Sequence, residues 1–159
     1  MDGESGVFFQ GYSPLSLDAK GRLAIPARYR ERLRDCCAAR LVITINPQER
    51  CLWVYPRNEW LVIAGQLARL PTLNRQNQTM KRLLLGRASE VEMDAQGRVL
   101  LSAELREYAN LDKRVVLSGD GRKFELWDEA RYNELFNGWL EEVAEPGSDL
   151  SEGLEQLAL

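Results

Sequence analysis

Apolar residues in the N-terminal half fall in short runs that predict strands, with one stretch of helical spacing between them. Residues 7–9, 15–17 and 22–25 predict strands, and the apolar runs 41–45 and 51–55, separated by polar residues, predict a hairpin. Pro26 is expected to start a short helix, because proline suits the first helical position, where no amide hydrogen bond is lost. Tyr29 and Leu33 stand four residues apart and would share the inner face of that helix.

The same order of elements returns in the C-terminal half. The apolar runs 115–118 and 124–127, with a turn at 119–121, predict a second hairpin. Each hairpin precedes an amphipathic helix, and Asp128 is expected to cap the second helix. The apolar stripes are Trp60, Ile63, Leu67 and Leu70 in one helix, and Tyr132, Leu135, Phe136, Trp139, Leu140 and Val143 in the other. At this spacing the aromatic residues favour packing over a base-stacking surface.

A nine-residue phrase occurs twice along the chain. Residues 17–25 (LDAKGRLAI) match residues 93–101 (MDAQGRVLL), 76 positions later. In both copies an Asp and a Gly stand at the first and fourth corners of a turn, the pattern of a type I turn, and an arginine follows. The match continues from 26–31 to 102–107 and from 51–55 to 124–127. The chain is therefore predicted to be two copies of one unit, each too small to be comfortably stable alone, packed around one core.

Charge is distributed unevenly between the two halves. The chain has 159 residues, 45% hydrophobic and 28% charged, with a net charge of −3, which is typical of a soluble globular protein. Residues 1–87 carry a balance of +7 and residues 88–159 a balance of −10. A basic front and an acidic tail favour head-to-tail association of neighbouring subunits, or a concentration of positive potential on one surface of the protein. The third reading is that these charges are ordinary solvated side chains. Apolar runs stay short of the roughly 18 residues that span a bilayer, so we expect no membrane contact and a cytoplasmic location.

Several kinds of chemistry are excluded by composition. The chain contains no histidine, which removes Ser-His and Cys-His catalysis and most zinc sites. Cys36, Cys37 and Cys51 form no Cys-x-x-Cys pair and are expected to be small buried hydrophobes in a reduced compartment. Glu90 and Glu92 would alternate on a strand and face solvent. We expect no enzyme activity, cofactor, metal or small-molecule substrate.

The ordered motifs of the chain resemble those of the MraZ family of bacterial transcriptional regulators. The motifs are Phe9-Gln10-Gly11, LDxKGR at 17–22, IPxRYR at 25–30, CLWVYP at 51–56, Glu59-Trp60, DxQGR at 94–98, LRxYA at 105–109 and FELW at 124–127. The resemblance implies an α+β, mainly β fold, in which two AbrB-like swapped-hairpin repeats form one β-barrel with flanking helices. With the helical and acidic patterns of the remaining residues, the predicted divisions are repeats at 7–56 and 88–128, connecting helices at 57–87 (one of them within 71–87), and a C-terminal amphipathic helix at 129–144. The acidic tail at 145–159 is expected to be frayed or to form a weak docking helix.

The resemblance also implies a function. It implies a transcriptional regulator, expected to be a repressor, that binds double-stranded DNA at direct repeats upstream of the division and cell-wall gene cluster, including its own promoter; the residues themselves leave repression and activation both open. It also implies a ring-shaped, octamer-type homo-oligomer in the cytoplasm, associated with the nucleoid, although the sequence leaves the number of subunits in the ring open. The family's Asp-x-x-x-Arg motif falls on Asp18 with Arg22 and on Asp94 with Arg98. The chain departs from the family pattern at Ser102, where proline is usual, which is expected to loosen the second strand-to-helix corner.

The chemistry of the matched residues agrees with that function. An arginine on a turn can place its planar guanidinium on guanine O6 and N7 in the major groove, so Arg22 and Arg98 are the predicted base-reading residues. Lys20, Arg28 and Gln96 are predicted to contact phosphates or base edges, and Gln96 makes the second loop less basic than the first. A head-to-tail ring would display its loops in one direction, which favours direct repeats about 10 bp apart.

Two alternatives remain at this level. Each arginine could simply form an exposed ion pair with the aspartate of its own turn. The chain could also be a ring-forming protein-interaction scaffold without DNA binding, which would use its acidic tail and aromatic helices. In that case replacing both loop arginines would leave the partner bound.

Overall fold

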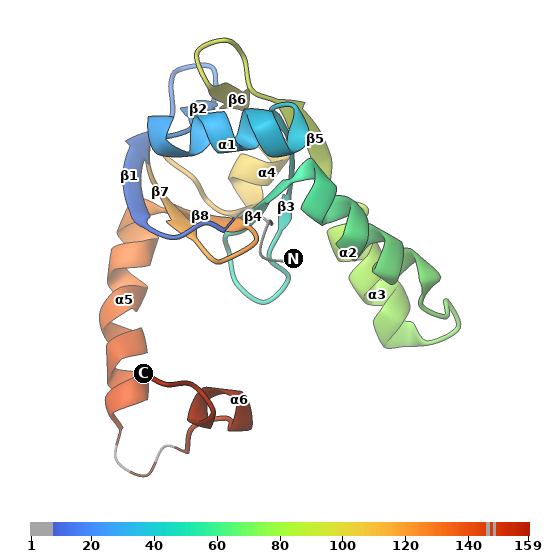
Figure 1. Ribbon diagram of the computed structural model, residues 1–159, viewed down its shortest axis with the longest axis vertical. Helices are drawn as coiled ribbons and strands as arrows, with labels where there is room; N and C mark the ends of the chain where they lie inside the picture. Colours follow the sequence, from blue (N-terminus) through green and yellow to red (C-terminus); the bar gives the residue numbers. More distant parts are fainter. Residues whose placement is uncertain (1–7, 146, 148) are drawn as a thin grey trace.

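The computed structural model describes residues 8–145, 147 and 149–159, and its centre is a six-stranded antiparallel sheet (Figure 1). In spatial order its strands are β1 (Tyr12–Ser16), β7 (Arg114–Gly119), β8 (Phe124–Asp128), β4 (Leu52–Pro56), β3 (Arg40–Ile45) and β5 (Ser89–Glu92). Two further short strands, β2 (Arg22–Ala24) and β6 (Arg98–Leu100), pair with each other as a separate antiparallel ladder. Both predicted hairpins, β3–β4 and β7–β8, are confirmed.

The strand order joins the two halves of the chain rather than keeping them apart. Strand β1 pairs with β7 of the other half, and β5 pairs with β3. The two hairpins meet at the centre of the sheet, where Leu52 of β4 lies opposite Leu126 of β8. Because each half contributes an edge strand to the other half's hairpin, neither half has a sheet of its own.

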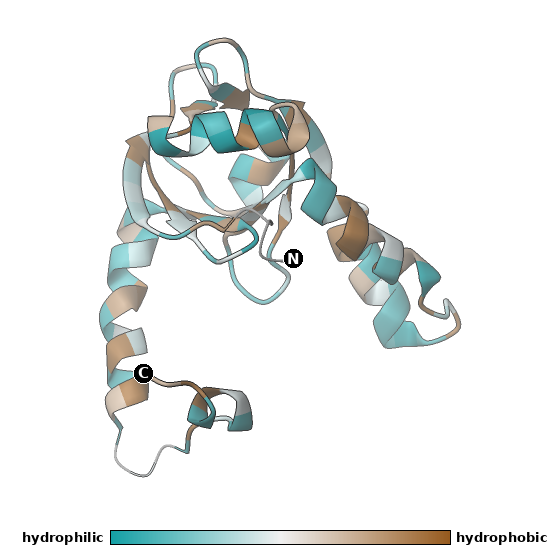
Figure 2. Cartoon of the chain, in the orientation of Figure 1, coloured by the Kyte–Doolittle hydropathy of each residue, from teal (hydrophilic) through white to brown (hydrophobic). Residues whose placement is uncertain are grey.

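The described part of the chain contains six helices. They are α1 (Ala27–Cys37), α2 (Arg57–Arg69), α3 (Arg75–Leu84), α4 (Ala103–Tyr108), α5 (Glu129–Ala144) and the short α6 (Glu152–Glu155). Helix α1 crosses the body of the molecule below the β2–β6 ladder, the α2–α3 pair projects to one side and α5 to the other (Figure 1). The strands beneath α1 are largely hydrophobic, whereas α1 itself shows mainly hydrophilic residues to the viewer (Figure 2).

The main core lies between the sheet, the ladder and α1. Phe9, Tyr29 and Phe124 form an aromatic group at its centre, with ring centroids 4.3 to 5.8 Å apart. Leu23 of β2 and Val99 of β6 are also buried in this core. The ladder is therefore fixed to the body of the protein by its inward-facing residues, which leaves its other face toward solvent.

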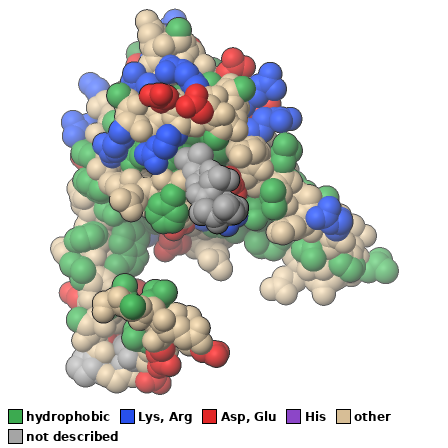
Figure 3. Space-filling model, in the orientation of Figure 1, with side chains coloured by type: hydrophobic (Ala, Val, Ile, Leu, Met, Phe, Trp, Pro, Cys, Tyr) green, Lys and Arg blue, Asp and Glu red, His purple; other side chains and the backbone are tan. Residues whose placement is uncertain are grey.

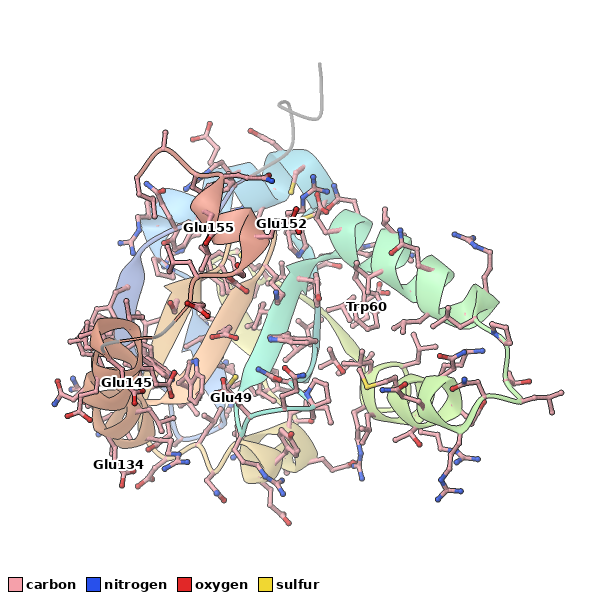
Figure 4. The ribbon with its side chains drawn as sticks, turned by 90° about the horizontal axis from the view of Figure 1, so that it is seen from below. Glu49, Trp60, Glu134, Glu145, Glu152 and Glu155 are labelled. Carbon is pink, nitrogen blue, oxygen red and sulfur yellow. The ribbon has the colours of Figure 1, made fainter. Side chains whose placement is uncertain are left out.

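Two smaller apolar clusters attach the outer helices. Helix α2 packs Trp60 against Tyr55 of β4, and the view from below shows Trp60 between α2 and the strands (Figure 4). The buried Thr44 hydroxyl of β3 donates a 2.8 Å hydrogen bond to the Leu84 carbonyl at the end of α3. On the other side, α5 packs its aromatic stripe against buried Trp127 of β8.

The predicted stripe of α5 divides into an inner and an outer part. Tyr132, Leu135 and Trp139 pack against β7 and β8 as expected, whereas Phe136, Leu140 and Val143 are exposed. Asp128 caps α5 as predicted, since its carboxylate accepts the Arg131 amide. On α2 the prediction for Leu70 was wrong, because the helix ends at Arg69 and Leu70 lies outside it, exposed.

The prediction of a mainly β barrel needs correction. Helical residues outnumber strand residues, because α2, α3 and α5 extend beyond the sheet, so the fold is mixed α/β. Among the described residues the six-stranded sheet has β1 and β5 as its edges, and the β2–β6 ladder is separate from it, so no closed barrel is formed. Between β1 and β2, Leu17 and Leu23 form a single isolated bridge rather than a continuous ladder. The pairing between the six-stranded sheet and the β2–β6 ladder is therefore interrupted at this corner.

Local boundaries also differ from the predictions. Helix α1 begins at Ala27, and Pro26 occupies the preceding cap position with an extended backbone. The predicted strand 15–17 is replaced by β1, which covers residues 12–16. In the predicted strand 7–9, Phe9 forms an isolated bridge to Gly121, and residue 7 lies outside the described part of the chain. Ser102 does not loosen the second corner, because its hydroxyl accepts the Leu105 amide and caps α4.

The connecting segment, tail and cysteines largely follow expectation. Within residues 71–87 the structure forms α3, and Glu90 and Glu92 on β5 face solvent. The described residues of the tail include one helical segment, the four-residue α6, and the leucines of the tail are exposed. All three cysteines are free; Cys51 is fully buried, which raises the pKa of its thiol to about 12, whereas Cys36 and Cys37 are half-buried against the core.

Candidate nucleic-acid interface

The first arginine loop is a turn closed by the aspartate that opens it. The Gly21 amide donates to the Asp18 carbonyl at 3.0 Å, which closes the predicted type I turn. The Asp18 carboxylate accepts the Lys20 and Arg22 amides at 2.9 and 2.8 Å, and its other oxygen accepts Arg22 Nε at 2.6 Å. Gly21 takes a φ of +82°, a conformation that glycine adopts without a steric penalty. The loop therefore fixes the direction of the Arg22 side chain.

The second loop repeats this arrangement atom for atom. Asp94 accepts the Gln96 and Arg98 amides at 2.9 Å each, and it accepts Arg98 Nε at 2.9 Å. The Gly97 amide donates to the Asp94 carbonyl, and Gly97 takes a φ of +77°. The expected alternative, an ion pair between each arginine and its own aspartate, is thus present in both loops. These ion pairs use Nε, and no terminal Nη nitrogen of either arginine is hydrogen-bonded within the described residues.

The two arginines lie on the same face of the β2–β6 ladder. Leu23 pairs with Val99 and both point into the core, so the residues on either side of them point outward. Arg22 lies opposite Leu100, two residues from Arg98, which makes the arginines diagonal neighbours across the ladder. Their side chains are 30% and 32% exposed. Both loops project from the same end of the molecule (Figure 1).

Hydrogen bonds hold both aspartates in their charged form. The amide of Arg22 contributes most to lowering the pKa of Asp18 from 3.8 to about 2, with further lowering by the Arg22 side chain and the Lys20 amide. The corresponding groups of Arg98 and Gln96 lower the pKa of Asp94. Both carboxylates are therefore ionised at neutral pH and orient their arginines.

The other three predicted contact residues are placed differently. Lys20 and Gln96 are exposed in the loops beside Arg22 and Arg98, and within the described residues their side chains have no hydrogen-bond or ion-pair partner. Arg28 is on α1, where its guanidinium donates to the Ser13 hydroxyl of β1 and lies 4.7 Å from the centre of the Tyr29 ring. The structure thus brings Lys20 and Gln96 together with the loop arginines but ties Arg28 to the β1 side of the helix.

Two arginines that sequence reasoning passed over also reach the loops. The guanidinium of Arg106 lies against Gly21 of the first loop, and that of Arg30 lies against Gly97 of the second. Arg106 also lines a cavity of about 520 Å³ beside the first loop, together with Asp18 and Lys113. A signal was available in the sequence, since Arg30 and Arg106 are related by the same 76-residue offset as the loops.

The surface around the loops is rich in basic side chains. Lys and Arg side chains gather over α1 beneath the loops, with acidic side chains among them (Figure 3). Part of the acidic charge of the C-terminal half, including Glu134 and Glu145, lies on or beside α5, which runs away from the loops (Figures 1 and 4). The α5 region therefore adds negative charge at a distance from the loops. No helix in the described part of the chain has the length and apolar character needed to span a bilayer.

Comparison with known proteins identifies the family. The family model described as "MraZ protein" matches the chain twice, over residues 8–83 and 84–147. A protein of Halorhodospira halophila is 48% identical over 95% of this chain and 99% of its own length, and one of Thioalkalivibrio sulfidiphilus is 50% identical over 89% and 96%. A protein of Pseudomonas aeruginosa is 45% identical over 95% and 99%. All three carry the name "Transcriptional regulator MraZ". With two consecutive family matches and relatives aligned over nearly their whole length, the chain belongs to the MraZ family.

Proposed function

We propose that this protein is a sequence-specific DNA-binding repressor that reads base edges with Arg22 and Arg98. The observation that carries the proposal is the placement of these two arginines on one outward face of the β2–β6 ladder, each oriented by its own aspartate. The names of the relatives support a role in transcription. An arginine whose Nε is held by a carboxylate still offers its Nη groups, which suits the paired acceptors O6 and N7 of guanine.

The spacing of the arginines fits two bases that lie two steps apart on one strand. Diagonal neighbours in an antiparallel ladder are separated by about 7 Å, close to two steps of about 3.4 Å along a DNA strand. The ladder could therefore present both guanidinium groups to one major groove. Asp18 and Asp94 are assigned a positioning role, because each carboxylate accepts the Nε of its own loop arginine.

Contacts to the DNA backbone are assigned to residues that flank the arginines. Lys20 and Gln96 are exposed on the loops, so both can reach phosphates or base edges, and only Lys20 adds charge. Arg28 is a weaker candidate for a phosphate contact than the sequence predicted, since Ser13 and Tyr29 hold its guanidinium. Salt dependence of binding is expected to come mainly from the basic surface around the loops.

The target and the assembly form part of the same proposal. The protein would bind direct repeats upstream of the division and cell-wall gene cluster, including its own promoter, as a ring-shaped, octamer-type homo-oligomer associated with the nucleoid. We place AbrB-like repeats at 7–56 and 88–128 with helical segments between and after them; two consecutive matches to one family model, over 8–83 and 84–147, support a duplicated chain. The separation of the basic and acidic regions and the exposed apolar residues of α5 are suited to contacts between subunits.

A mobility-shift titration tests the proposal. The wild type and the double variant Arg22→Ala/Arg98→Ala are titrated with duplex DNA from upstream of the protein's own gene and with a scrambled duplex, each at two salt concentrations. We expect the wild type to prefer the upstream duplex and the double variant to lose that preference. Equal binding of both duplexes by the wild type, or an unchanged preference in the double variant, would contradict the assignment.

A ring-forming scaffold without DNA binding is the second candidate. It is favoured by one observation, the exposure of Phe136, Leu140 and Val143 along α5, which leaves an apolar surface. This candidate predicts that the wild type binds neither duplex and that a protein partner stays bound to the double arginine variant. The titration therefore separates the two functions.

A further inference from the structure

Arg30 connects the first half of the chain to the second arginine loop. Its Nε donates a 2.6 Å hydrogen bond to the Ile25 carbonyl, and the Ile25 amide donates to the Gly97 carbonyl at 2.8 Å. The guanidinium lies so close to Gly97 that a Cβ at this position would be 2.3 Å from Arg30 Nε. The loop that carries Arg98 is thus held by a corner and an arginine of the other half.

Arg106 makes the reciprocal connection. Its Nε donates to the Leu101 carbonyl at 3.3 Å, and the Leu101 amide donates to the Gly21 carbonyl at 3.0 Å. A Cβ at Gly21 would be 2.8 Å from Arg106 Nε. Every residue in this set is 76 positions from its counterpart in the first, so both loops are supported in the same way from the opposite half.

From this crossed arrangement we propose that Arg30 and Arg106 are positioning residues for base reading, each acting through the loop of the other half. Arg30 sets the position of Arg98, and Arg106 sets the position of Arg22. The proposal rests on the proposed function, because the effect is read out as selectivity for DNA. It adds two residues to the site and assigns each of them to one particular loop.

The geometry requires arginine rather than any cation. A guanidinium is planar, so it can lie flat against a glycine while its Nε donates to a backbone carbonyl, whereas the ammonium of lysine is a compact charge without that shape. A residue that acts only by charge at a phosphate would tolerate lysine. The substitutions Arg30→Lys and Arg106→Lys therefore distinguish positioning from direct phosphate contact.

The first measurement is selectivity. Affinities of wild type, Arg30→Lys, Arg30→Gln, Arg106→Lys and Arg106→Gln are measured for the upstream duplex and the scrambled duplex across a salt series, after circular dichroism has shown that each variant is folded. We expect each lysine variant to lose about tenfold in the ratio of the two affinities, as much as its glutamine counterpart, with the salt slope unchanged. Full rescue by lysine, together with a uniform loss and a smaller slope for glutamine, would show phosphate contacts and overturn the proposal.

The second measurement tests the crossed assignment. Double-mutant cycles combine Arg30→Lys with Arg98→Ala and, as the matched control, with Arg22→Ala. Once Arg98 is absent, Arg30→Lys should cause little further loss of selectivity, whereas in the Arg22→Ala background it should keep its full effect. The cycles with Arg106→Lys should show the reverse. Equal coupling to both loops, or coupling to neither, would overturn the proposal.

A measurement without DNA keeps the positioning proposal testable if the wild type does not bind the upstream duplex. In amide NMR spectra Arg30→Lys should shift the Gly97 resonance and leave that of Gly21 nearly unchanged, and Arg106→Lys should do the opposite. Crossed shifts without DNA binding would mean that the proposed function fails while the support of the loops holds. Uncrossed or absent shifts would overturn the positioning itself.

Discussion

Replacing Gly97 by alanine tests the contact between the second loop and the opposite half most directly. An added Cβ would be 2.3 Å from Arg30 Nε, which no native contact allows, so the arginine must move away. Gly121 provides a matched control, because its φ of +82° is close to the +77° of Gly97 but its Cβ would meet only the Phe8 ring, at 3.9 Å. The two substitutions share the backbone strain and differ in the collision.

The expected magnitudes follow from these two terms. A non-glycine residue in the left-handed region costs about 1–2 kcal/mol, which is the whole expected effect of Gly121→Ala on the free energy of unfolding. Gly97→Ala also displaces Arg30 from the Ile25 carbonyl, a charged hydrogen bond that contributes about 1.5 kcal/mol or more. We therefore expect Gly97→Ala to destabilise the protein by about 3 kcal/mol.

Equilibrium urea denaturation measures both effects, with every variant at the same protein concentration, because self-association shifts apparent stability. In an Arg30→Ala background the collision is absent, so Gly97→Ala should then cost no more than Gly121→Ala. Equal costs for the two glycine substitutions in the wild-type background would refute the reasoning, since they would show that Arg30 does not occupy this space.

Four further outcomes are expected. A duplex carrying one repeat should bind at least tenfold more weakly than one carrying three or four, because linked contacts add through effective concentration. Equal affinities of these duplexes in a gel-shift titration would contradict this expectation. By NMR the Asp18 carboxyl should titrate with a pKa of about 2. The stabilisation that its charged form provides is therefore complete above pH 3.8 and is lost as the pH falls toward 2. A titration midpoint at pH 3.8 would contradict the hydrogen bonding to Arg22. Thr44→Val should lower the free energy of unfolding by about 1–3 kcal/mol, because it leaves the Leu84 carbonyl unpaired. An unchanged free energy of unfolding in urea denaturation would mean that this hydrogen bond does not hold α3. Asp128→Ala should remove the cap of α5 at a cost of about 1 kcal/mol, and unchanged stability in the same assay would rule out that role.

Much of the local structure could be predicted because it depends on residues close together in the sequence. The two turns form as expected, since Asp18 and Gly21 make all the necessary hydrogen bonds within one turn. Both hairpins and the cap at Asp128 follow from patterns a few residues long. Helix boundaries are less local, as Pro26 shows, because a proline suits either the first helical position or the cap before it.

The candidate site was predictable only in part. The repeated phrase identified Arg22 and Arg98, and their shared face follows once β2 and β6 are paired. The basic side chain of Arg28 predicts a phosphate contact, but packing of α1 directs its guanidinium to Ser13. The exposed outer stripe of α5 likewise depends on how far the helix extends beyond the sheet.

The sequence by itself determined the two turns, the arginines that follow them and the duplication that relates them, because each is written in a few adjacent residues and repeated at a fixed offset. Only the tertiary structure decided which half supports which loop. Arg30 and Gly97 are far apart along the chain and meet because β2 pairs with β6 and each corner bonds to the opposite turn. Such a contact is set by the packing of the two halves on a common core, and no local pattern contains it.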